Sequence, residues 1–268
     1  MLANTSRTRA TAFDADADGY AAGRPHVDTD AVSDLIQLCD LAPGAHVLEA
    51  GAGTGQLTVA LLAAGLHVTA IEPGASMADR LRRLAAGEPG LTVIEDTFER
   101  ADLSGRRFDA VLSANAWHWV DPSIGLPKLA TVTLPHACLG LVWTFFVAAD
   151  AGVQRRLNSE VLHGELGDLA RDPAGYRDAI DASMVAGSAE REASGYVGTA
   201  ALRHHRRRRN LDVAAYVALL TSFAGHADAG AALGRRIAAC GLGPSIEVLD
   251  DAHVCVAPIV TVEASARP

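Results

Sequence analysis

The sequence predicts an α/β protein with a doubly wound, seven-stranded, mostly parallel sheet, an antiparallel final strand and a helical lid insertion. Two observations predict the sheet: short apolar runs alternate with amphipathic segments up to residue 146, and a glycine-rich turn separates the first run from the second. A third observation predicts the insertion, because residues 150–195 are polar and only weakly periodic.

The first half supplies five strands and the helices between them. Residues 28–40 carry apolar side chains at helical spacing, and residues 47–49 form a short apolar run. We expect a helix over 54–64, with Gly65 as its stop. Further strands are expected at 67–72, 91–95, 108–114 and 137–145, and further helices at 76–86 and 123–134.

The second half completes the sheet. After the polar insertion, a sixth strand is expected within 196–210, helices within 211–223 and 227–240, and the antiparallel strand within 245–262. The predicted organisation is therefore a helical cap over the binding site (1–40), a core (41–146), a lid insertion (147–196) and a segment that completes the sheet (197–268).

Composition limits the function. The 268 residues are 49% hydrophobic with a net charge of −9, which disfavours a general nucleic-acid binder. The four cysteines lie far apart without a Cys-x-x-Cys pair, so we expect neither a zinc knuckle nor a dithiol centre, and a reducing cytoplasm fits. No apolar stretch follows the N-terminal arginines, and the most apolar run, 138–149, is too short to span a membrane.

The glycine turn is the most informative motif. It reads E-x-G-x-G-x-G over residues 49–55, and Glu72 follows the second strand. Glycine lets a ligand approach the backbone, and the helix after the turn offers N–H groups to an anion. The dinucleotide pattern G-x-G-x-x-G is excluded by Gln56 and Thr58, and no Gly-Lys-Ser/Thr of a phosphate loop follows. The turn predicts a nucleoside ligand; the alternative is a tight turn and nothing more.

This segment resembles motif I of class I S-adenosylmethionine-dependent methyltransferases, in the type 11-like branch that acts on small molecules. The resemblance extends to Y-x-x-G-R-P at 20–25, DTFE at 96–99 and FDAVLSANAWHWVDP at 108–122. It covers residues 13–146 well and 210–223 loosely, and LPHAC at 134–138 replaces the usual Pro-Gly-Gly turn. The resemblance implies a Rossmann-like fold and S-adenosylmethionine as cofactor.

The same resemblance implies the roles of individual residues. Glu49 would accept the ammonium group, backbone N–H groups near the turn would face the carboxylate, and Glu72 would accept from the ribose hydroxyls. Met77 would pack on the adenine or, equally, belong to the core. The full cofactor set is Tyr20, Arg24, Glu49, Gly51, Ala52, Gly53, Gly55, Glu72, Pro73, Met77, Thr97, Phe98, Asn115 and Ala116.

The loop after the fourth strand is where open α/β sheets bind substrates. His118 is the candidate catalytic base, because it titrates near neutral pH; the alternative is a hydrogen-bonded structural histidine. The expected acceptor pocket consists of Trp117, Trp119, Phe145 and Phe146, with packing under the next helix as the alternative for the tryptophans.

Three polar signals remain. DADADG begins like a calcium loop, but Pro25 stands where its glutamate belongs. HHRRRR at 204–209 suggests an edge strand protected by charge, with an acidic substrate group at Arg206 or Arg208 as the alternative. His163 and Glu165 are too isolated for a metal site, so no metal is expected.

The expected function is methyl transfer to a small molecule, a specialised metabolite, by in-line displacement. The alternatives are a non-methylating enzyme on the same scaffold, such as a cyclase, and a non-catalytic partner that binds the cofactor. The expected partner is a small-molecule acceptor, without nucleic acid or membrane, and the oligomeric state stays open, with a homodimer as one option.

Overall fold

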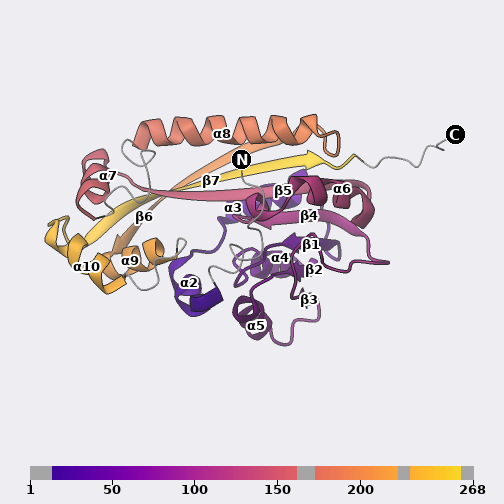
Figure 1. Cartoon of the computed structure of the whole chain (residues 1–268), viewed down its shortest axis with the longest axis horizontal. Coiled ribbons are helices and arrows are strands. Elements are labelled where there is room, and N and C mark those ends of the chain that lie inside the picture. The colour runs from indigo at the N-terminus through magenta and orange to yellow at the C-terminus, as the bar shows by residue number, and fades with distance from the viewer. Residues whose placement is uncertain (1–13, 162–172, 223–229, 261–268) are drawn as a thin grey trace.

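The computed structural model describes residues 14–161, 173–222 and 230–260. Within them, one seven-stranded sheet has the order β3-β2-β1-β4-β5-β7-β6 (Figure 1). All neighbouring strands from β3 to β5 are parallel, and β7 is antiparallel to both β5 and β6. The strands are β1 (His46–Ala50), β2 (His67–Ile71), β3 (Leu91–Ile94), β4 (Phe108–Ala114), β5 (Thr133–Ala148), β6 (Ala201–Asp212) and β7 (Ser245–Pro258). The predicted fold class is confirmed.

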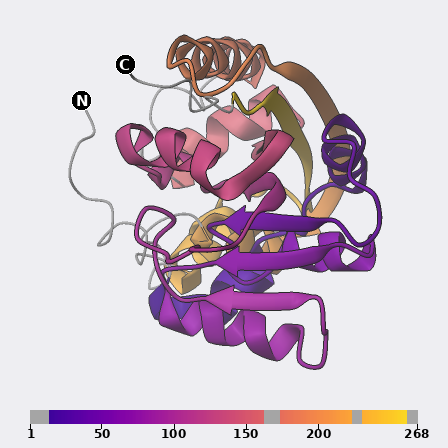
Figure 2. The same ribbon diagram turned by 90° about the vertical axis from the view of Figure 1, so that its right-hand side faces the viewer.

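Helices connect these strands and cover both faces of the sheet (Figure 2). The short elements are η1 (Asp14–Asp16), α2 (Ala17–Gly23), α4 (Thr58–Ala63), η2 (Trp117–Trp119), α7 (Ala151–Arg156) and η3 (Leu157–Val161). The longer helices are α3 (Thr29–Leu38), α5 (Ala75–Leu84), α6 (Pro122–Val132), α8 (Pro173–Ala193), α9 (Val213–Thr221) and α10 (Gly230–Ala239).

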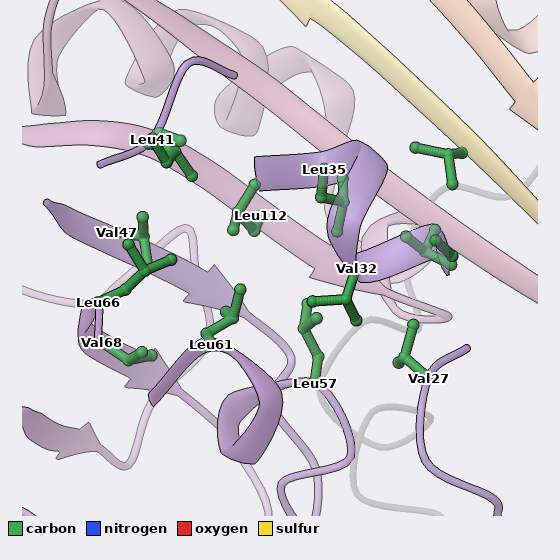
Figure 3. Close-up of a cluster of buried hydrophobic side chains, with 14 of the residues drawn as sticks. Val27, Val32, Leu35, Leu41, Val47, Leu57, Leu61, Leu66, Val68 and Leu112 are labelled. Atoms are coloured by element: carbon green, nitrogen blue, oxygen red, sulfur yellow. The ribbon is translucent and has the colours of Figure 1, made fainter. Parts of the chain in front are cut away.

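Alternation along the strands separates two hydrophobic cores. Val47 and Leu112 face α3 and α4 and pack with Leu35 and Leu61 (Figure 3). The next residue of each strand turns to the other face, where Leu48 joins the cluster beneath α6. A strand with both faces buried reads as a continuous apolar run, which is why these strands were visible in the sequence.

A third cluster lies at the far end of β5 and β7. It joins the end of β5 and the start of β7 to η3, α9 and α10. The helix α8 lies along the outer side of the sheet beside β7 (Figure 1), where Arg191 reaches Cys255 Sγ at 3.5 Å. The residues 150–195 are thus largely helical, as expected, apart from residues 162–172, which lie outside the described residues together with His163 and Glu165.

Two details differ from the sequence expectation. The helix after the glycine turn begins at Thr58 rather than at Thr54. Every second residue of the turn, Gly51, Gly53 and Gly55, has a positive φ angle, which a right-handed helix does not allow. The fifth strand begins at Thr133, before the LPHAC segment, and pairs with β7 as far as Ala148.

A disulfide joins Cys39, at the end of α3, to Cys138 in β5. The expectation from the sequence concerned only a Cys-x-x-Cys motif and did not anticipate this pair. The two residues are 99 positions apart, and only the packing of α3 on the sheet brings them together. Cys240 and Cys255 are free and buried.

No helix among the described residues is both long enough and apolar enough to cross a membrane.

Candidate functional site

The candidate site lies at the carboxyl ends of β1, β2 and β4, where the topology predicts a ligand. Two adjoining cavities open there, of about 710 and 450 Å³. Both are bordered by Tyr20 from α2, by the turn residues Gly51 and Gly53, and by Ala114 and Asn115 at the end of β4. Together they form an elongated cleft with two chemically different ends.

The larger cavity is mainly apolar with one buried acid. Its walls come from the ends of β1 and β2, from α5 and from the loops that follow β3 and β4. Besides the shared residues it is lined by Ala50, Ile71, Glu72, Pro73, Met77, Thr97, Phe98, Glu99, Ala116, Trp119 and Val120. Such a wall suits a flat heteroaromatic group with a hydroxylated neighbour.

The smaller cavity carries the charged groups. Glu49 borders it from β1, and Arg24, the residue that caps the C-terminus of α2, borders it from the end of that helix. Thr144 and Phe146 border it from β5. Its remaining lining residues are Pro25, Val27, Ala52, Gln56 and Leu57. This end therefore offers a carboxyl group and a guanidinium group to a zwitterionic ligand.

The three glycines of the turn have different functions. A side chain on Gly51 would overlap Ala116, and one on Gly55 would lie 2.8 Å from Leu81 Cδ1, so packing requires both. A Cβ on Gly53 would meet nothing closer than 3.8 Å and would enter the shared wall of the cavities. Among the three glycines, Gly53 is therefore the one whose side chain would occupy ligand space without a clash inside the protein. Gly55 lines neither cavity.

Glu72 is 4% exposed and is held by two backbone groups of the turns around it. Gly53 N donates to its Oε2 at 2.8 Å and Gly74 N to its Oε1 at 2.9 Å. Burial raises the pKa of Glu72 to about 7; these two hydrogen bonds lower it in part, and the charge of Asp14 raises it again. The backbone therefore fixes the position of a carboxyl group whose protonated form burial favours.

Glu49 is 1% exposed at the end of β1. Thr58, the first residue of α4, donates its hydroxyl to Glu49 Oε2 at 2.6 Å. Burial raises the pKa of Glu49 to about 8, the Thr58 hydrogen bond lowers it, and the charge of Glu72 raises it further. No arginine or lysine forms an ion pair with Glu49 or Glu72 within the described ranges.

Asn115 links the two strands that border the cleft. Its backbone is left-handed, with φ 54°, a conformation that asparagine adopts more readily than most residues. Its N–H donates to Val142 O at 2.8 Å, and its side-chain Oδ1 accepts from Thr144 N at 2.8 Å. The loop after β4 is thereby anchored to β5 directly beside the smaller cavity.

The structure brings most of the expected cofactor residues together, and the exception is Gly55. Of the expected acceptor residues, Trp119 lines the larger cavity and Phe146 the smaller one. Trp117 instead packs in the core beneath α6, with its ring 5.4 Å from that of Phe98. Phe145 lies on the opposite face of β5 from Phe146, against His253 at 5.7 Å. Neither Trp117 nor Phe145 lines the two cavities, and Trp117 follows the alternative of packing under the next helix.

His118 lines neither cavity. Its ring is exposed at the surface and lies 4.7 Å from the ring of Trp119. Surrounding side chains desolvate it and lower its pKa, and the nearby charge of Arg24 lowers the pKa further. A neutral imidazole therefore stands at the rim of the cleft rather than within it.

Several lining residues were missed in the sequence. Glu99 follows Phe98 directly and accepts from Asp121 N at 2.7 Å, so the quoted DTFE segment already contained it. Thr144 and Gln56 carry no signal of their own, because a single polar residue beside a strand or in a turn is common. Asp14 lines neither cavity, but it accepts from Met77 N at 3.1 Å and its charge acts on Glu72.

The DADADG segment is helical rather than a calcium loop. Asp16 caps α2 by accepting from Gly19 N, and Asp18 pairs with Arg80. Its carboxylates thus point to separate partners instead of converging on one ion.

The basic run of β6 is neutralised within the chain. Its side chains alternate between the faces of the sheet: Arg206 and Arg208 pair with Asp251 and Glu247 of β7. Arg207 on the other face pairs with Asp28 and Asp30 at the start of α3. The run is an edge strand with internal partners, and the alternative of an acidic substrate group at Arg206 or Arg208 finds no support in this arrangement.

Comparison with known proteins agrees with the geometry. Residues 47–135 match the family model described as a methyltransferase domain. An uncharacterized methyltransferase of Mycobacterium tuberculosis is 39% identical over 137 residues, which are 51% of this chain and 54% of that protein. The chain thus spans about half the length of the curated relatives it matches.

Solved structures share the fold over most of the chain. A structure assigned provisionally as a type II methyltransferase from Anaeromyxobacter dehalogenans has a TM-score of 0.57 at 18% identity, covering 88% of this chain and 98% of that one. The [4+2]-cyclase SpnF has a TM-score of 0.52 at 15% identity, covering 94% and 97%. Residues 47–135 are thus similar to a methyltransferase domain, and the sheet has the fold of these solved structures.

Proposed function

We propose that the protein transfers a methyl group from S-adenosylmethionine to a small molecule, and that this acceptor is a specialised metabolite. The observation that carries the proposal is the pair of buried carboxyl groups, Glu49 and Glu72, which lie at the two ends of one cleft and form no ion pair with an arginine or lysine that the structure describes. Burying such groups without a cation is costly, which makes them candidates for ligand binding.

The cleft residues fit this ligand end by end. Glu72 would accept hydrogen bonds from the ribose hydroxyls, and Met77 and Phe98 would border the adenine. Glu49 would accept from the ammonium group and Arg24 would face the carboxylate. A Cβ on Gly53 would reduce the space between the two ends. When bound, S-adenosylmethionine supplies an electrophilic methyl group on a sulfonium.

The protein's part in the reaction would be positioning. Aligning an acceptor with the methyl group can accelerate transfer strongly, since effective molarities of about 10⁵–10⁸ M are known for well-oriented groups. Asn115, Thr144 and Phe146 border the end of the cleft where an acceptor would approach. His118 lies at the rim, close to Trp119, and could take a proton there only from an acceptor that extends beyond the cleft.

Direct methyl transfer is the decisive experiment, because a [4+2]-cyclase shares this fold and the fold does not choose the reaction. The purified chain would be titrated calorimetrically with S-adenosylmethionine and then incubated with the methyl-labelled compound and panels of phenols, amines and carboxylic acids. We expect one binding site and label in at least one acceptor class. No heat of binding would refute the cofactor, and binding without transfer to any acceptor would refute the reaction.

We also propose the cytoplasm as its site of action, as the cysteine pattern indicated. In a reducing compartment Cys39 and Cys138 would be thiols. Alkylation of these residues in freshly lysed cells under denaturing conditions, before any oxidation, checks this; full resistance to alkylation would contradict it.

A further inference from the structure

The outer strands β6 and β7 carry a second group of polar side chains, away from the cleft. His204 of β6 is directly opposite His253 of β7 in the register, and Arg206 is opposite Asp251. Residues 251 and 253 are two apart, so their side chains project from the same face of the sheet. This face is the one covered by α8, since Asp181 of that helix reaches His253.

Three of these residues present ligand atoms to a common point. One ring nitrogen from each of His204 and His253 and a carboxylate oxygen of Asp251 all lie within 4.8 Å of one another. Two atoms that each lie about 2.1 Å from a shared zinc ion are at most about 4.2 Å apart. Small side-chain rotations on a fixed backbone would therefore bring the three atoms to coordination distance.

His253 is buried and incompletely satisfied. It is 7% exposed, and its Nε2 has no hydrogen-bond partner among the described residues. Its Nδ1 lies 3.5 Å from Asp181 Oδ1. A carboxylate behind one ring nitrogen fixes the tautomer and frees the other nitrogen, the usual arrangement behind a metal-binding histidine.

The group is reachable from outside. A cavity of about 570 Å³ lies between α8 and the two strands, lined by both histidines and by Asp181. Its other lining residues are Met184, Val185, Leu202, Arg203, Val254 and Cys255. An ion could enter here without opening the sheet, and water could complete its coordination.

We propose that His204, His253 and Asp251 bind a divalent transition-metal ion, of the class of Zn²⁺ or Co²⁺. Two imidazoles and one carboxylate suit these ions, whereas Mg²⁺ and Ca²⁺ prefer oxygen ligands alone. Arg206 donates from Nε and Nη2 to both oxygens of Asp251, at 3.0 and 3.1 Å, and holds the carboxylate in place. Oδ2 keeps a further lone pair for the ion, whereas Oδ1 also hydrogen-bonds with His204 Nε2, a contact that the bound ion would replace.

The neighbouring group on the other face provides a natural control. Asp28, Asp30 and His205 also lie within 4.8 Å of one another. There Arg207 pairs with both carboxylates, and Asp28 additionally caps α3. Adjacent histidines of one strand, His204 and His205, thus belong to opposite faces and to separate groups.

The test uses the full chain freed of metal with a chelator. Zn²⁺ is titrated calorimetrically, and Co²⁺ is followed by its visible d–d absorption, in the wild type and in His204→Gln, His253→Gln and His205→Gln. His204 is exposed, so its variant should fold; circular dichroism checks all three. We expect one Co²⁺ per chain, at least tenfold weaker binding in His204→Gln and His253→Gln, and wild-type affinity in His205→Gln.

Asp181→Asn adds a test of the carboxylate behind His253. Losing such a partner costs about 10–100-fold in metal affinity, so an intermediate loss is expected. The proposal is overturned by absence of Zn²⁺ and Co²⁺ binding, by affinity unchanged in a folded His204→Gln, or by loss of binding in His205→Gln alone.

Discussion

The two halves of the sheet bury carboxyl groups in opposite ways. In the half that contains β1 and β2, Glu49 and Glu72 are buried without a cationic partner in the described part of the chain, and burial raises their pKa values to about 8 and about 7. In the half that contains β6 and β7, Asp251 is equally buried, but hydrogen bonds from Arg206 and His204 outweigh burial and lower its pKa.

This difference separates S-adenosylmethionine binding from support of the sheet. A buried acid with an arginine on the neighbouring strand has a cationic partner within the chain and holds the two strands together. A buried acid without a cation keeps an unfavourable state that an incoming ammonium or hydroxyl group can relieve. Changes in the first half should therefore alter ligand affinity, and changes in the second half should alter the free energy of unfolding.

The largest effect is expected within the glycine turn itself. Gly53→Ala should weaken S-adenosylmethionine binding at least 100-fold, because the methyl group enters the cleft, and the left-handed backbone should cost only about 1–2 kcal/mol. Gly55→Ala should instead destabilise the fold by about 1–3 kcal/mol, because its methyl group meets Leu81. Calorimetry and urea unfolding on both variants separate the two effects; equal affinity losses would remove the distinction.

Glu49→Gln should weaken binding about 30-fold or more, since the amide cannot pair with an ammonium group. The same substitution should raise the thermal stability of the ligand-free protein at alkaline pH. The raised pKa of Glu49 stabilises the ligand-free fold below pH 4.5 and this contribution is lost as pH rises through about 8. The variant lacks this loss, so its Tm at pH 8.5 should exceed that of the wild type. A lower Tm would contradict the assigned pKa.

Arg206→Ala tests the other half. It leaves Asp251 buried with His204 as its remaining partner and should destabilise the fold by about 2 kcal/mol without changing affinity for S-adenosylmethionine. The matched control is Arg208→Ala, whose partner Glu247 is exposed, and its cost should stay below about 1 kcal/mol. Urea unfolding measures both, and a weakened affinity in either variant would break the comparison.

The pH dependence of binding should follow the cleft acids. Between pH 6.0 and 7.5 the affinity of the wild type for S-adenosylmethionine should rise by about 100-fold or more, because Glu49 and Glu72 must both lose protons to receive the ligand. Calorimetry in buffers of different ionisation enthalpy should register proton release on binding. Proton uptake, or an affinity that falls over this range, would reverse the assignment.

The smallest effect is expected for His118→Ala. Because the ring is exposed and outside both cavities, transfer to an identified acceptor should slow less than about threefold, with unchanged cofactor affinity. A base contributes about 10²–10⁴-fold. A loss of that size, with its pH profile shifted accordingly, would return His118 to the catalytic group.

The strands could be predicted because strands buried on both faces have continuous apolar sequences. The glycine turn after the first of them predicted the general position of the cleft. Side-chain direction could not be predicted. Phe145 and Phe146 are adjacent aromatic residues, so the sequence does not distinguish them. The alternation of β5 places Phe146 at the smaller cavity and Phe145 against His253.

Contacts between segments that are distant in the sequence could not be predicted either. Trp117 is buried by α6 and Phe98 rather than by a ligand, and nothing in its own sequence neighbourhood distinguishes the two. The partners of β6 arginines come from residues more than 35 positions away, so a basic run read alone suggests an external anion.

The bond between Cys39 and Cys138 closes a covalent ring around β1 to β4, which includes the whole glycine turn. In the oxidised protein, a single protease cut anywhere in this ring would leave one molecule on a non-reducing gel. Ring closure over about 100 residues also restricts the denatured chain by about 4.7 kcal/mol in the loop-entropy account. In the oxidised protein the ligand-binding half would thus be stabilised by a covalent cross-link, while β6 and β7, which follow the ring in the sequence, would be held by non-covalent contacts.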